Sequence, residues 1–335
     1  MIVAITGASG YLGRAVAAEL VAAGHEVRTL QRRASGVDGA TDVLGSITDA
    51  QTVARALDGA DGVIHLAAKV SLAGDPAEFR AVNVDGTRLL IDAAERAGIS
   101  RLVHVSSPSV AHAGRALDGV GAEPASPAHA RGEYARTKAE AELLALTRDS
   151  TALRVVVIRP HLVWGPGDPQ LVGRILDRAR RGRLPLLDGG RALIDSTYID
   201  NAATGLVAAL HRAEHAHGRA FVLTNGEPRP VGELLTSMCL ASNVRPPSWS
   251  LPAGVARAAG SVIERVWALR PGVDEPPMTR FLAEQLSTAH WFDQRETRDA
   301  LDWAPSVSID EGIRRLAAHT ARETGEAAVV ARVVR

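Results

Sequence analysis

Tyr134 and Lys138 have the residue types and the spacing that acid–base chemistry needs. Both lie in the helix-like stretch EYARTKAE, residues 133–140. Residues four apart share one face of a helix, so the lysine ammonium would lie beside the phenol. The ammonium would favour the phenolate and lower the tyrosine pKa from about 10 toward the range that proton transfer uses. The same spacing also arises by chance on solvated helix faces.

Lysine is rare in this chain. Of 38 cationic side chains only two are lysines, Lys69 and Lys138, and all the others are arginines. A lysine is a compact donor on a flexible stem, so it can adjust a phenol and hydrogen-bond a ribose hydroxyl at once. The fixed fork of arginine suits that double task poorly. Retention of lysine at position 138 therefore favours a chemical role.

A glycine-rich stretch, TGASGYLG at residues 6–13, stands between an apolar run and a helix-like run. Gly7 would permit a tight turn, Gly10 a close approach of a pyrophosphate, and Gly13 close packing of helix on strand. The helix N-terminus would offer free N–H groups to the phosphates. The stretch predicts a dinucleotide site, although a plain strand–helix turn can also use three glycines.

The residues after the second apolar run select between cofactors. NAD-binding chains usually place an acid there for the ribose 2′-hydroxyl. This chain reads TLQRRAS, with Gln31, Arg32 and Arg33, and the next acid along the chain is Asp38. A guanidinium pairs with a 2′-phosphate, which an acid would repel. We therefore predict NADP(H), with Arg32 as the main contact; a solvated basic loop is the alternative.

The elements that would position these residues alternate along the chain. Helix-like stretches at 12–23, 48–57, 77–97 and 131–147 separate apolar runs at 2–5, 26–30, 62–67, 101–106 and 154–159. Apolar strands joined by helices indicate a parallel sheet covered on both faces, the doubly wound α/β Rossmann arrangement. A further strand is expected at 219–224. We assign residues 1–160 and 190–225 to this core, 161–189 and 226–323 to a smaller substrate-binding region, and 324–335 to a tail.

Composition narrows the class of protein. The 335 residues carry no net charge, which gives no reason to expect nucleic acid as a partner. Cys239 is the one cysteine, and no Cys/His cluster has metal-ligand spacing, so no disulfide or metal site is expected. The sequence shows no signal-like segment and no uncharged apolar run of membrane-spanning length. These features predict a cytoplasmic enzyme or sensor that binds a small molecule.

Seven motifs in order make the chain resemble the extended short-chain dehydrogenase/reductases over almost its whole length. They are TGASGYLG (6–13), HLAA (65–68), NVDGT (83–87), VSSPSV (105–110), YARTK (134–138), RPHLVWGPGD (159–168) and STYIDNAATG (196–205). The resemblance implies a Rossmann core, a nicotinamide cofactor and a Ser/Thr–Tyr–Lys catalytic set. A non-catalytic sensor would usually lack the Tyr–Lys pair.

The resemblance assigns roles residue by residue. Tyr134 and Lys138 match the catalytic pair, and Ser107 matches the catalytic hydroxyl, with Ser106 as the fallback. Asn83 matches an asparagine that braces the site or relays protons. The cofactor-binding positions implied are Gly7, Ser9, Gly10, Tyr11, Leu12, Gly13, Arg32, Arg33, Ser46, Ile47, Leu66, Ala67, Ala68, Asn83, Tyr134, Lys138, Pro160 and His161.

One position departs from the family pattern. Relatives often have Gly-Asp after the third strand, where the acid holds the adenine amine, but this chain has Gly45-Ser46. Ser46 is then a weaker partner, or Asp49 substitutes for it.

Within the family the chain is most similar to the 3β-hydroxysteroid dehydrogenase-like branch, through residues 281–316. RPHLVWGPGD, LIDSTYIDNAATG and LTNGEPRPVGELL look like the bacterial 2-alkyl-3-oxoalkanoate reductases of olefin biosynthesis. That resemblance implies reduction of a long-chain β-keto acid. A steroid or sterol dehydrogenase shares every catalytic residue and stays open. Residues 281–316, the C-terminal signature of that branch, do not match a sugar-nucleotide epimerase, which disfavours that alternative.

Substrate contacts are expected from Lys69, Ser107, His161 and Trp164. Lys69 would meet the acid group, though a surface lysine is an equal alternative. The stretch 252–270 reads as a helix packed on the domain, or else as an apolar lid, a membrane contact or a contact with another enzyme of the same pathway. Relatives commonly form homodimers through a helix bundle, for which 77–97 and 131–147 are the candidates.

Overall fold

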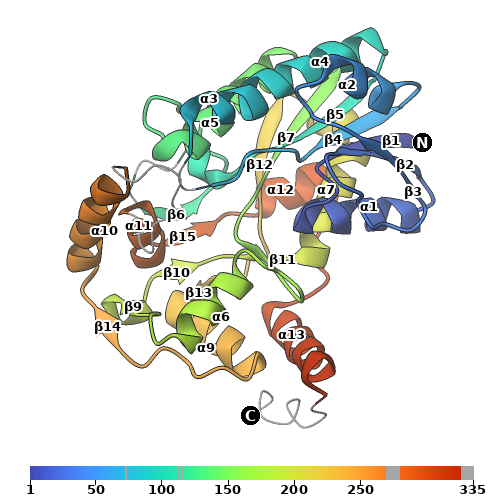
Figure 1. The fold of residues 1–335 in the computed structure, drawn as a ribbon. Helices are drawn as coiled ribbons and strands as arrows, with labels where there is room; N and C mark the ends of the chain where they lie inside the picture. The colour runs from blue at the N-terminus through green and yellow to red at the C-terminus, as the bar shows by residue number, and fades with distance from the viewer. Residues whose placement is uncertain (72–73, 112–113, 115, 269–279, 326–335) are drawn as a thin grey trace.

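A computed structural model describes residues 1–71, 74–111, 114, 116–268 and 280–325. Within them seven parallel strands form one sheet in the order β12-β7-β5-β4-β1-β2-β3 (Figure 1). Their bounds are β1 Ile2–Thr6, β2 Glu26–Gln31, β3 Ala40–Leu44, β4 Gly62–His65, β5 Arg101–Val105, β7 Arg154–Pro160 and β12 Arg219–Leu223. The order reverses between β1 and β4, as in a doubly wound fold. The Rossmann prediction is confirmed.

Helices cover both faces of the sheet, so its central strands are buried and apolar. One face packs on α1 (Tyr11–Ala22) and α7 (Ile199–His211). The other packs on α2 (Ala50–Leu57), α4 (Gly86–Arg96) and α5 (Gly132–Thr147) (Figure 1). The short helix α8 (Ala213–Ala216) follows α7. This layering fixes α5 against β5 and β7, where the predicted catalytic residues lie.

The strand β3 was not among the apolar runs from which we predicted strands, although the comparison of Gly45-Ser46 with relatives implied a strand before them. Its sequence ATDVL has no continuous apolar run, because the strand forms the sheet edge and its residues are largely exposed. Parallel pairing places Asp42 of β3 opposite Thr29 of β2. A carboxylate therefore lies near the end of β2, although the next acid along the chain after Gln31 is Asp38.

The helical stretch expected at 77–97 is not one uniform helix. It consists of α3 (Pro76–Arg80), a π-helical turn at Ala81–Asp85 and then α4. Asp75 caps α3 by accepting the Ala77 N–H at 2.9 Å. A π turn widens the helix locally and is frequent at functional sites. Here it contains Asn83, whose side chain is buried.

A second region adjoins the sheet and contains four short strands of a mixed sheet, in the order β13-β10-β15-β6, within the described part of the chain. Their bounds are β6 Leu117–Val120, β10 Leu193–Ile194, β13 Arg229–Pro230 and β15 His290–Phe292. The pairs β8 (Val163–Trp164) with β11 (Thr197–Tyr198), and β9 (Leu186–Leu187) with β14 (Ser250–Leu251), accompany it.

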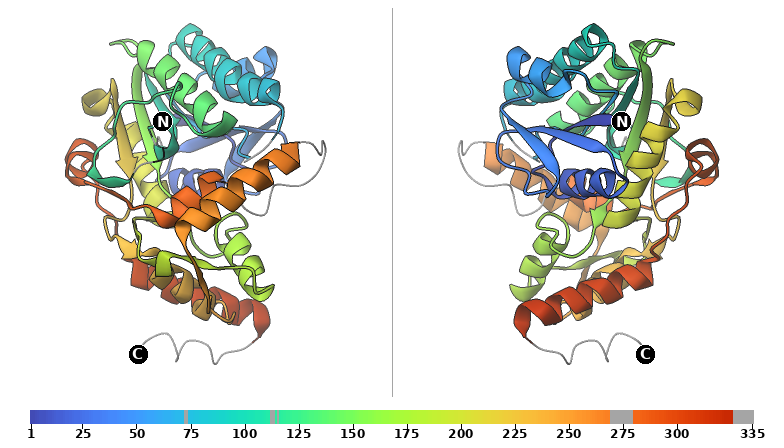
Figure 2. Two further views of the ribbon diagram at one scale, coloured as in Figure 1. Left: turned by 90° about the vertical axis from the view of Figure 1, so that its left-hand side faces the viewer. Right: turned by 90° about the vertical axis from the view of Figure 1, so that its right-hand side faces the viewer.

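The helices of this region are α6 (Val172–Arg180), α9 (Val231–Ala241), α10 (Ala253–Ala268), α11 (Arg280–Ser287) and α13 (Ile309–Thr324). Figure 2 shows α13 at the opposite end of the molecule from α4. The remaining helix, α12 (Arg295–Leu301), packs Leu301 back into the core beneath α7 and α1. Residues 326–335, nearly all of the predicted tail, lie outside the described residues.

Helix α10 confirms a helix in the stretch 252–270, of which residues 269 and 270 fall outside the description. It packs through the small residues Ala253 and Ala256. Val255 and Val262 of the same helix are 55% and 59% exposed. The apolar side chains of this helix therefore do not all pack on the domain. Among the helices in the described ranges, none combines the length and the apolar character needed to cross a membrane.

Candidate active site

The candidate site lies where β5 ends and α5 begins. Tyr134 is in the first turn of α5, and Ser107 lies two residues beyond β5. Burial raises the pKa of Tyr134 to about 12, and the neighbouring Ser107 hydroxyl opposes that rise. Tyr134 is therefore a protonated donor at neutral pH, with Ser107 beside it.

Lys138 lies one turn further along α5 and is almost completely buried. Its ammonium donates a 2.6 Å hydrogen bond to the Val105 carbonyl at the end of β5. Burial lowers the pKa of Lys138 to about 8, and the Glu142 carboxylate opposes that shift. We expected Lys138 to lower the pKa of Tyr134. That expectation was wrong for this structure, because burial of the phenol dominates.

Ser107 is oriented by its own loop. Its Oγ accepts the Ser109 N–H at 3.3 Å and the Ser109 hydroxyl at 2.9 Å, where a 3-10 turn at Pro108–Val110 begins. With these two bonds accepted, the Ser107 hydroxyl proton is left for Tyr134 or a substrate oxygen. Ser106, the fallback, has no hydrogen-bond partner for its Oγ among the described residues.

Asn83 braces the catalytic helix from the π turn. Its Oδ1 accepts the Lys69 N–H at 2.7 Å, and its Nδ2 donates to the Lys69 carbonyl at 3.2 Å and to Thr137 Oγ1 at 3.0 Å. Thr137 directly precedes Lys138. The three side-chain hydrogen bonds of Asn83 all go to structural partners, which favours the bracing role over proton relay.

His65 at the end of β4 links the glycine loop to this brace, and it is not among the site residues that we predicted. Thr87 donates its hydroxyl proton to the Asn83 carbonyl at 2.6 Å, so it must accept from His65 Nε2 at 3.0 Å. Nδ1 then accepts from the Thr6 hydroxyl at 2.7 Å. Burial lowers the pKa of His65 to about 3, so it is neutral. His65 is the first residue of the motif HLAA, which was the sequence signal that could have identified it.

The glycine loop has the geometry of a phosphate cradle. Gly7 has φ +80°, and a Cβ there would lie 2.9 Å from the Ala67 nitrogen. A Cβ on Gly13 would lie 2.3 Å from the Gly7 carbonyl oxygen. Gly10 caps α1 without a side chain, which leaves the first N–H groups of the helix to a ligand. A dinucleotide pyrophosphate therefore fits these residues.

The rest of the loop contacts the second region. Tyr11 donates its hydroxyl to the Pro166 carbonyl at 3.2 Å, and burial raises its pKa well above the usual range. Asp168 accepts the N–H groups of Gln170, Leu171 and Val172 and so caps α6. Ser9 and Leu12 flank the cradle, while Leu66, Ala67 and Ala68 follow β4 on the facing side.

Arg32 and Arg33 follow β2 and are exposed. Among the described residues, no hydrogen bond or ion pair engages either guanidinium. Asp42 accepts hydrogen bonds from the Thr29 hydroxyl at 2.6 Å, Gln31 Nε2 at 3.0 Å and the Ser35 N–H at 3.0 Å. Burial alone would raise the pKa of Asp42, but these hydrogen bonds have the larger effect and lower it. Asp42 thus shapes the arginine loop, and its oxygens are already bonded.

Ser46 and Ile47 follow β3, where an adenine would lie. The Ser46 hydroxyl is bonded to the Thr48 hydroxyl at 2.8 Å and is exposed. Asp49, the proposed substitute, caps α2 by accepting the Gln51 N–H at 3.1 Å and the Thr52 hydroxyl. Asp49 is thus engaged as a helix cap, and Ser46 is likewise bonded within its own turn, so both candidates for the adenine contact stay open.

Pro160 ends β7, and His161 follows it with little exposure. His161 Nδ1 lies 2.6 Å from the Asp195 carbonyl, so this nitrogen carries the proton. Trp164 has no exposed surface, and its Nε1 donates to Ser196 Oγ at 3.0 Å. A side chain without exposed surface cannot line a pocket, so the substrate role for Trp164 is corrected to a core role.

Lys69 lies on the segment that follows HLAA. Its ammonium pairs with Glu78 and lies 5.3 Å from the centre of the Phe79 ring. The side chain is a quarter exposed. Its charge is therefore already compensated within the structure.

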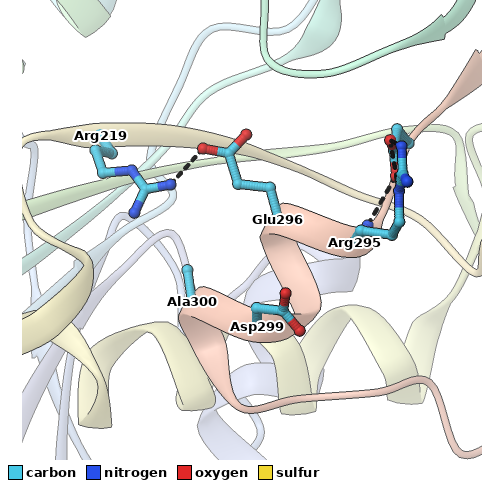
Figure 3. A pocket seen from close by; sticks show the side chains of 6 residues that line it. Arg219, Arg295, Glu296, Asp299 and Ala300 are labelled. Atoms are coloured by element: carbon cyan, nitrogen blue, oxygen red, sulfur yellow. Dashed lines mark hydrogen bonds and ion pairs between the residues drawn. The ribbon is translucent and has the colours of Figure 1, made fainter.

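A different depression is shown in Figure 3, with a volume of about 640 Å³, lined by Arg219, Asp293, Arg295, Glu296, Asp299 and Ala300. Its arginines are paired, Arg219 with Glu296 and Arg295 with Asp293. Arg219 begins β12, whereas ligands of doubly wound sheets bind at carboxyl ends of strands. This depression is therefore not the candidate site. Within the described residues, no group of three or more His, Cys, Asp or Glu is placed to hold a metal ion.

Comparison with known proteins agrees with this geometry. Residues 3–224 match the model of the "NAD dependent epimerase/dehydratase family". A 2-alkyl-3-oxoalkanoate reductase of Stenotrophomonas maltophilia is 39% identical over 96% of this chain and all of its own length. A 2-alkyl-3-oxoalkanoate reductase of Shewanella oneidensis is 36% identical over 94% of this chain and 85% of its own.

More distant matches include a 3beta-hydroxysteroid-dehydrogenase/decarboxylase of Arabidopsis thaliana, 33% identical over 82% of this chain and 50% of its own length. The crystal structure of gox2253 superposes with a TM-score of 0.76, at 28% identity, over 97% of this chain and 99% of its own. MoeE5 in complex with UDP-glucose and NAD has a TM-score of 0.75 at 23% identity, covering 97% of this chain and all of its own. That last likeness shows the shared fold.

Proposed function

Because the chain belongs to the NAD dependent epimerase/dehydratase family of extended short-chain dehydrogenase/reductases, we propose that it reduces a long-chain 2-alkyl-3-oxoalkanoate to the 2-alkyl-3-hydroxyalkanoate, with NADPH as cofactor. The family, with its reductase and dehydrogenase relatives, makes the chain an oxidoreductase. The observation that carries the proposed chemistry is the placement of Ser107 beside Tyr134, with Lys138 buried one turn further along α5 and bonded to the Val105 carbonyl.

The nicotinamide cofactor, when bound, supplies the hydride for the 3-oxo carbon. The carbonyl oxygen of the substrate would lie between the hydroxyls of Tyr134 and Ser107, where two donors stabilise the developing negative charge. Tyr134 donates its proton to that oxygen. A phenol whose pKa is about 12 is fully protonated at neutral pH, which is the state that reduction requires. Ser107 keeps the oxygen in place.

Lys138 serves the reaction from behind Tyr134. One of its three N–H donors is bound by the Val105 carbonyl, which leaves a donor for a ribose hydroxyl of the cofactor. The Asn83–Thr137 bond keeps this turn of α5 in position. The glycine loop, Arg32 and Ser46 would bind the rest of NADPH.

The substrate class rests on the two reductase relatives at 36% and 39% identity. Lys69 is our proposed partner for the substrate carboxylate. To bind it, the ammonium would exchange Glu78 for the substrate acid. A Lys69→Met variant with an unchanged KM for the acid would remove this part of the proposal.

The direct test runs the reaction in the oxidative direction, since β-keto acids lose CO2 spontaneously. Purified protein is given NADP+ or NAD+ with a racemic long-chain 2-alkyl-3-hydroxy acid, and separately with a 3β-hydroxysteroid. Cofactor reduction with the hydroxy acid and NADP+ is expected. Turnover of the steroid alone would replace the substrate class by that of the Arabidopsis relative and leave the catalytic residues in place.

The proton donor is tested in the same assay. Tyr134→Phe is expected to lower kcat by about 10²- to 10⁴-fold, the usual contribution of a general acid, while NADPH binding stays near the wild-type value. Tyr198→Phe is the matched control, because Tyr198 packs in the core of the second region. Wild-type turnover by Tyr134→Phe would refute the assignment.

A further inference from the structure

His104 on β5 is a buried polar side chain without a hydrogen-bond partner. It has no exposed surface, and neither ring nitrogen is bonded to any group among the described residues. A neutral imidazole carries one N–H donor and one acceptor. Leaving both unbonded inside a protein is costly, and buried polar groups in such positions usually bind ordered water. The mechanism above does not use this residue.

One more buried polar group without a partner among the described residues, Ser106 Oγ, and the Lys138 ammonium belong to the same space between β5 and α5. Side chains at positions 104 and 106 leave a strand on the same face. Leu102, which shares that face, packs in the cluster that contains Ala145 of α5. Ser106 Oγ is also buried and unpartnered within the described residues. From α5, Lys138 brings an ammonium with three donors and one described acceptor, the carbonyl of Val105, the residue next to His104.

We propose that an ordered internal water joins the Lys138 ammonium to the His104 ring, and that His104 is thereby a positioning residue for the catalytic lysine. The water accepts from Lys138 and donates to the ring nitrogen that has no proton. Ser106 Oγ, on the same face, is a second partner for this water. The catalytic part of this proposal rests on the proposed function, in which Lys138 acts with Tyr134.

The surrounding charges define what His104 can contribute. The titratable groups that face this space are Tyr134, Lys138 and Glu142 from α5, His65 from β4, whose ring centre is 5.5 Å from that of His104, and Arg159 from β7, which is paired with Glu142. Burial, the Lys138 charge and His65 all lower the pKa of His104 well below its usual value. His104 therefore stays neutral and acts as a polar partner without titrating.

The consequence concerns the protonation of Lys138. Burial already lowers its pKa to about 8. A polar partner that accepts from the ammonium favours the charged form, so removal of that partner lowers the pKa further. Lys138 would then lose its charge closer to neutral pH, and the alkaline limb of the pH–rate profile would move to lower pH.

Two variants of matched size test this. His104→Phe keeps the ring volume and removes the polar atoms, while His104→Gln keeps an acceptor and a donor that do not titrate. The pH dependence of kcat is measured for both. In His104→Phe we expect the alkaline limb to move to lower pH by about one unit, with kcat at pH 8 reduced about fivefold and the KM for substrate little changed. In His104→Gln we expect a profile close to wild type.

A wild-type pH profile in folded His104→Phe would overturn the proposal, and so would a His104→Gln profile displaced as far as that of His104→Phe. Should His104→Phe fail to fold, a high-resolution crystal structure of the wild-type protein decides. It must show a water within hydrogen-bond distance of both a His104 ring nitrogen and Lys138 Nζ, and its absence would refute the inference. This readout needs no substrate, so it also separates failure of the inference from failure of the proposed function.

Discussion

Glu142 and Arg159 form an ion pair whose side chains are 1% and 2% exposed, between α5 and β7. Arg159 Nε donates to Glu142 at 3.0 Å, and its Nη1 donates to the Glu123 carbonyl at 2.7 Å. Glu142 lies one helical turn beyond Lys138, as Lys138 lies one turn beyond Tyr134. The pair therefore anchors α5 to the sheet, and its carboxylate also supports the charge on Lys138.

Replacing Glu142 by Gln should leave Arg159 buried without a counter-charge. We expect a loss of about 3–5 kcal/mol in the free energy of unfolding, the usual cost of breaking a buried pair, measured by urea denaturation. Glu140→Gln is the control on the same helix, since Glu140 pairs with Arg80 and Arg136 nearer the surface and should cost about 1 kcal/mol or less. Equal losses in the two variants would contradict the anchoring role.

Arg32 is expected to distinguish the two nicotinamide cofactors. Arg32→Ser should weaken NADPH binding by about 10- to 100-fold, as loss of a charged hydrogen bond does, and leave NADH binding unchanged. Arg33→Ser is the neighbouring control and should have a smaller effect. Cofactor dissociation constants from fluorescence titration measure both. A parallel loss of NADPH and NADH affinity in Arg32→Ser would argue against contact with the 2′-phosphate.

Gly13 has no space for a side chain. In Gly13→Ala the new Cβ would lie 2.3 Å from the Gly7 carbonyl oxygen, so α1 must move away from the loop. We expect a lower melting temperature and at least a tenfold weaker binding of either cofactor. Gly254→Ala is the control, because a Cβ there meets nothing within 4 Å and alanine favours a helix by about 0.5–1 kcal/mol. Unchanged cofactor binding in Gly13→Ala would refute the cradle.

Asp195 gives the fold a dependence on pH. Burial raises its pKa from 3.8 to about 6, although the Thr224 hydroxyl and the N–H groups of Ser196 and Glu227 are bonded to it. The folded state therefore prefers the protonated carboxyl. Its contribution to stability is full below about pH 4 and is lost as the pH rises through 6.

The measurement compares the wild-type protein with Asp195→Asn. The free energy of unfolding of the wild type, relative to that of the variant, should fall by about 3 kcal/mol between pH 4 and pH 7, since about two pKa units separate the folded and unfolded states. Denaturation curves at a series of pH values provide this difference. A difference that stays constant across the range would show that Asp195 does not titrate as described.

The central strands were predictable because both of their faces are buried, so β1, β4, β5 and β7 are nearly continuous apolar runs. The edge strand β3 lacks such a run, and with it the position of Asp42 was missed. Spacing alone predicted that Tyr134 and Lys138 share a helix face. The direction of the Tyr134 pKa shift depends on burial by segments distant in sequence, which spacing does not report.

Trp164 shows the same limit. A tryptophan in a motif next to the site is compatible with a pocket wall or with a core. The outcome depends on its packing with Tyr198 and the bond to Ser196, which come from a segment more than thirty residues later. His65 was quoted within HLAA, but its role depends on Thr6 and Thr87, from two other elements.

The small sheet joins β6, β10, β13 and β15, whose residues range from Leu117 to Phe292. Contacts between segments so far apart form late, because long loops must close before the pairing is gained. While the chain is being synthesised, the strands β1 to β5 can pair before β15 exists, but β6 cannot. The loop between β5 and α5, which contains β6, is therefore completed only after β15 has been synthesised, and the first strands of the large sheet can pair before the small sheet is complete.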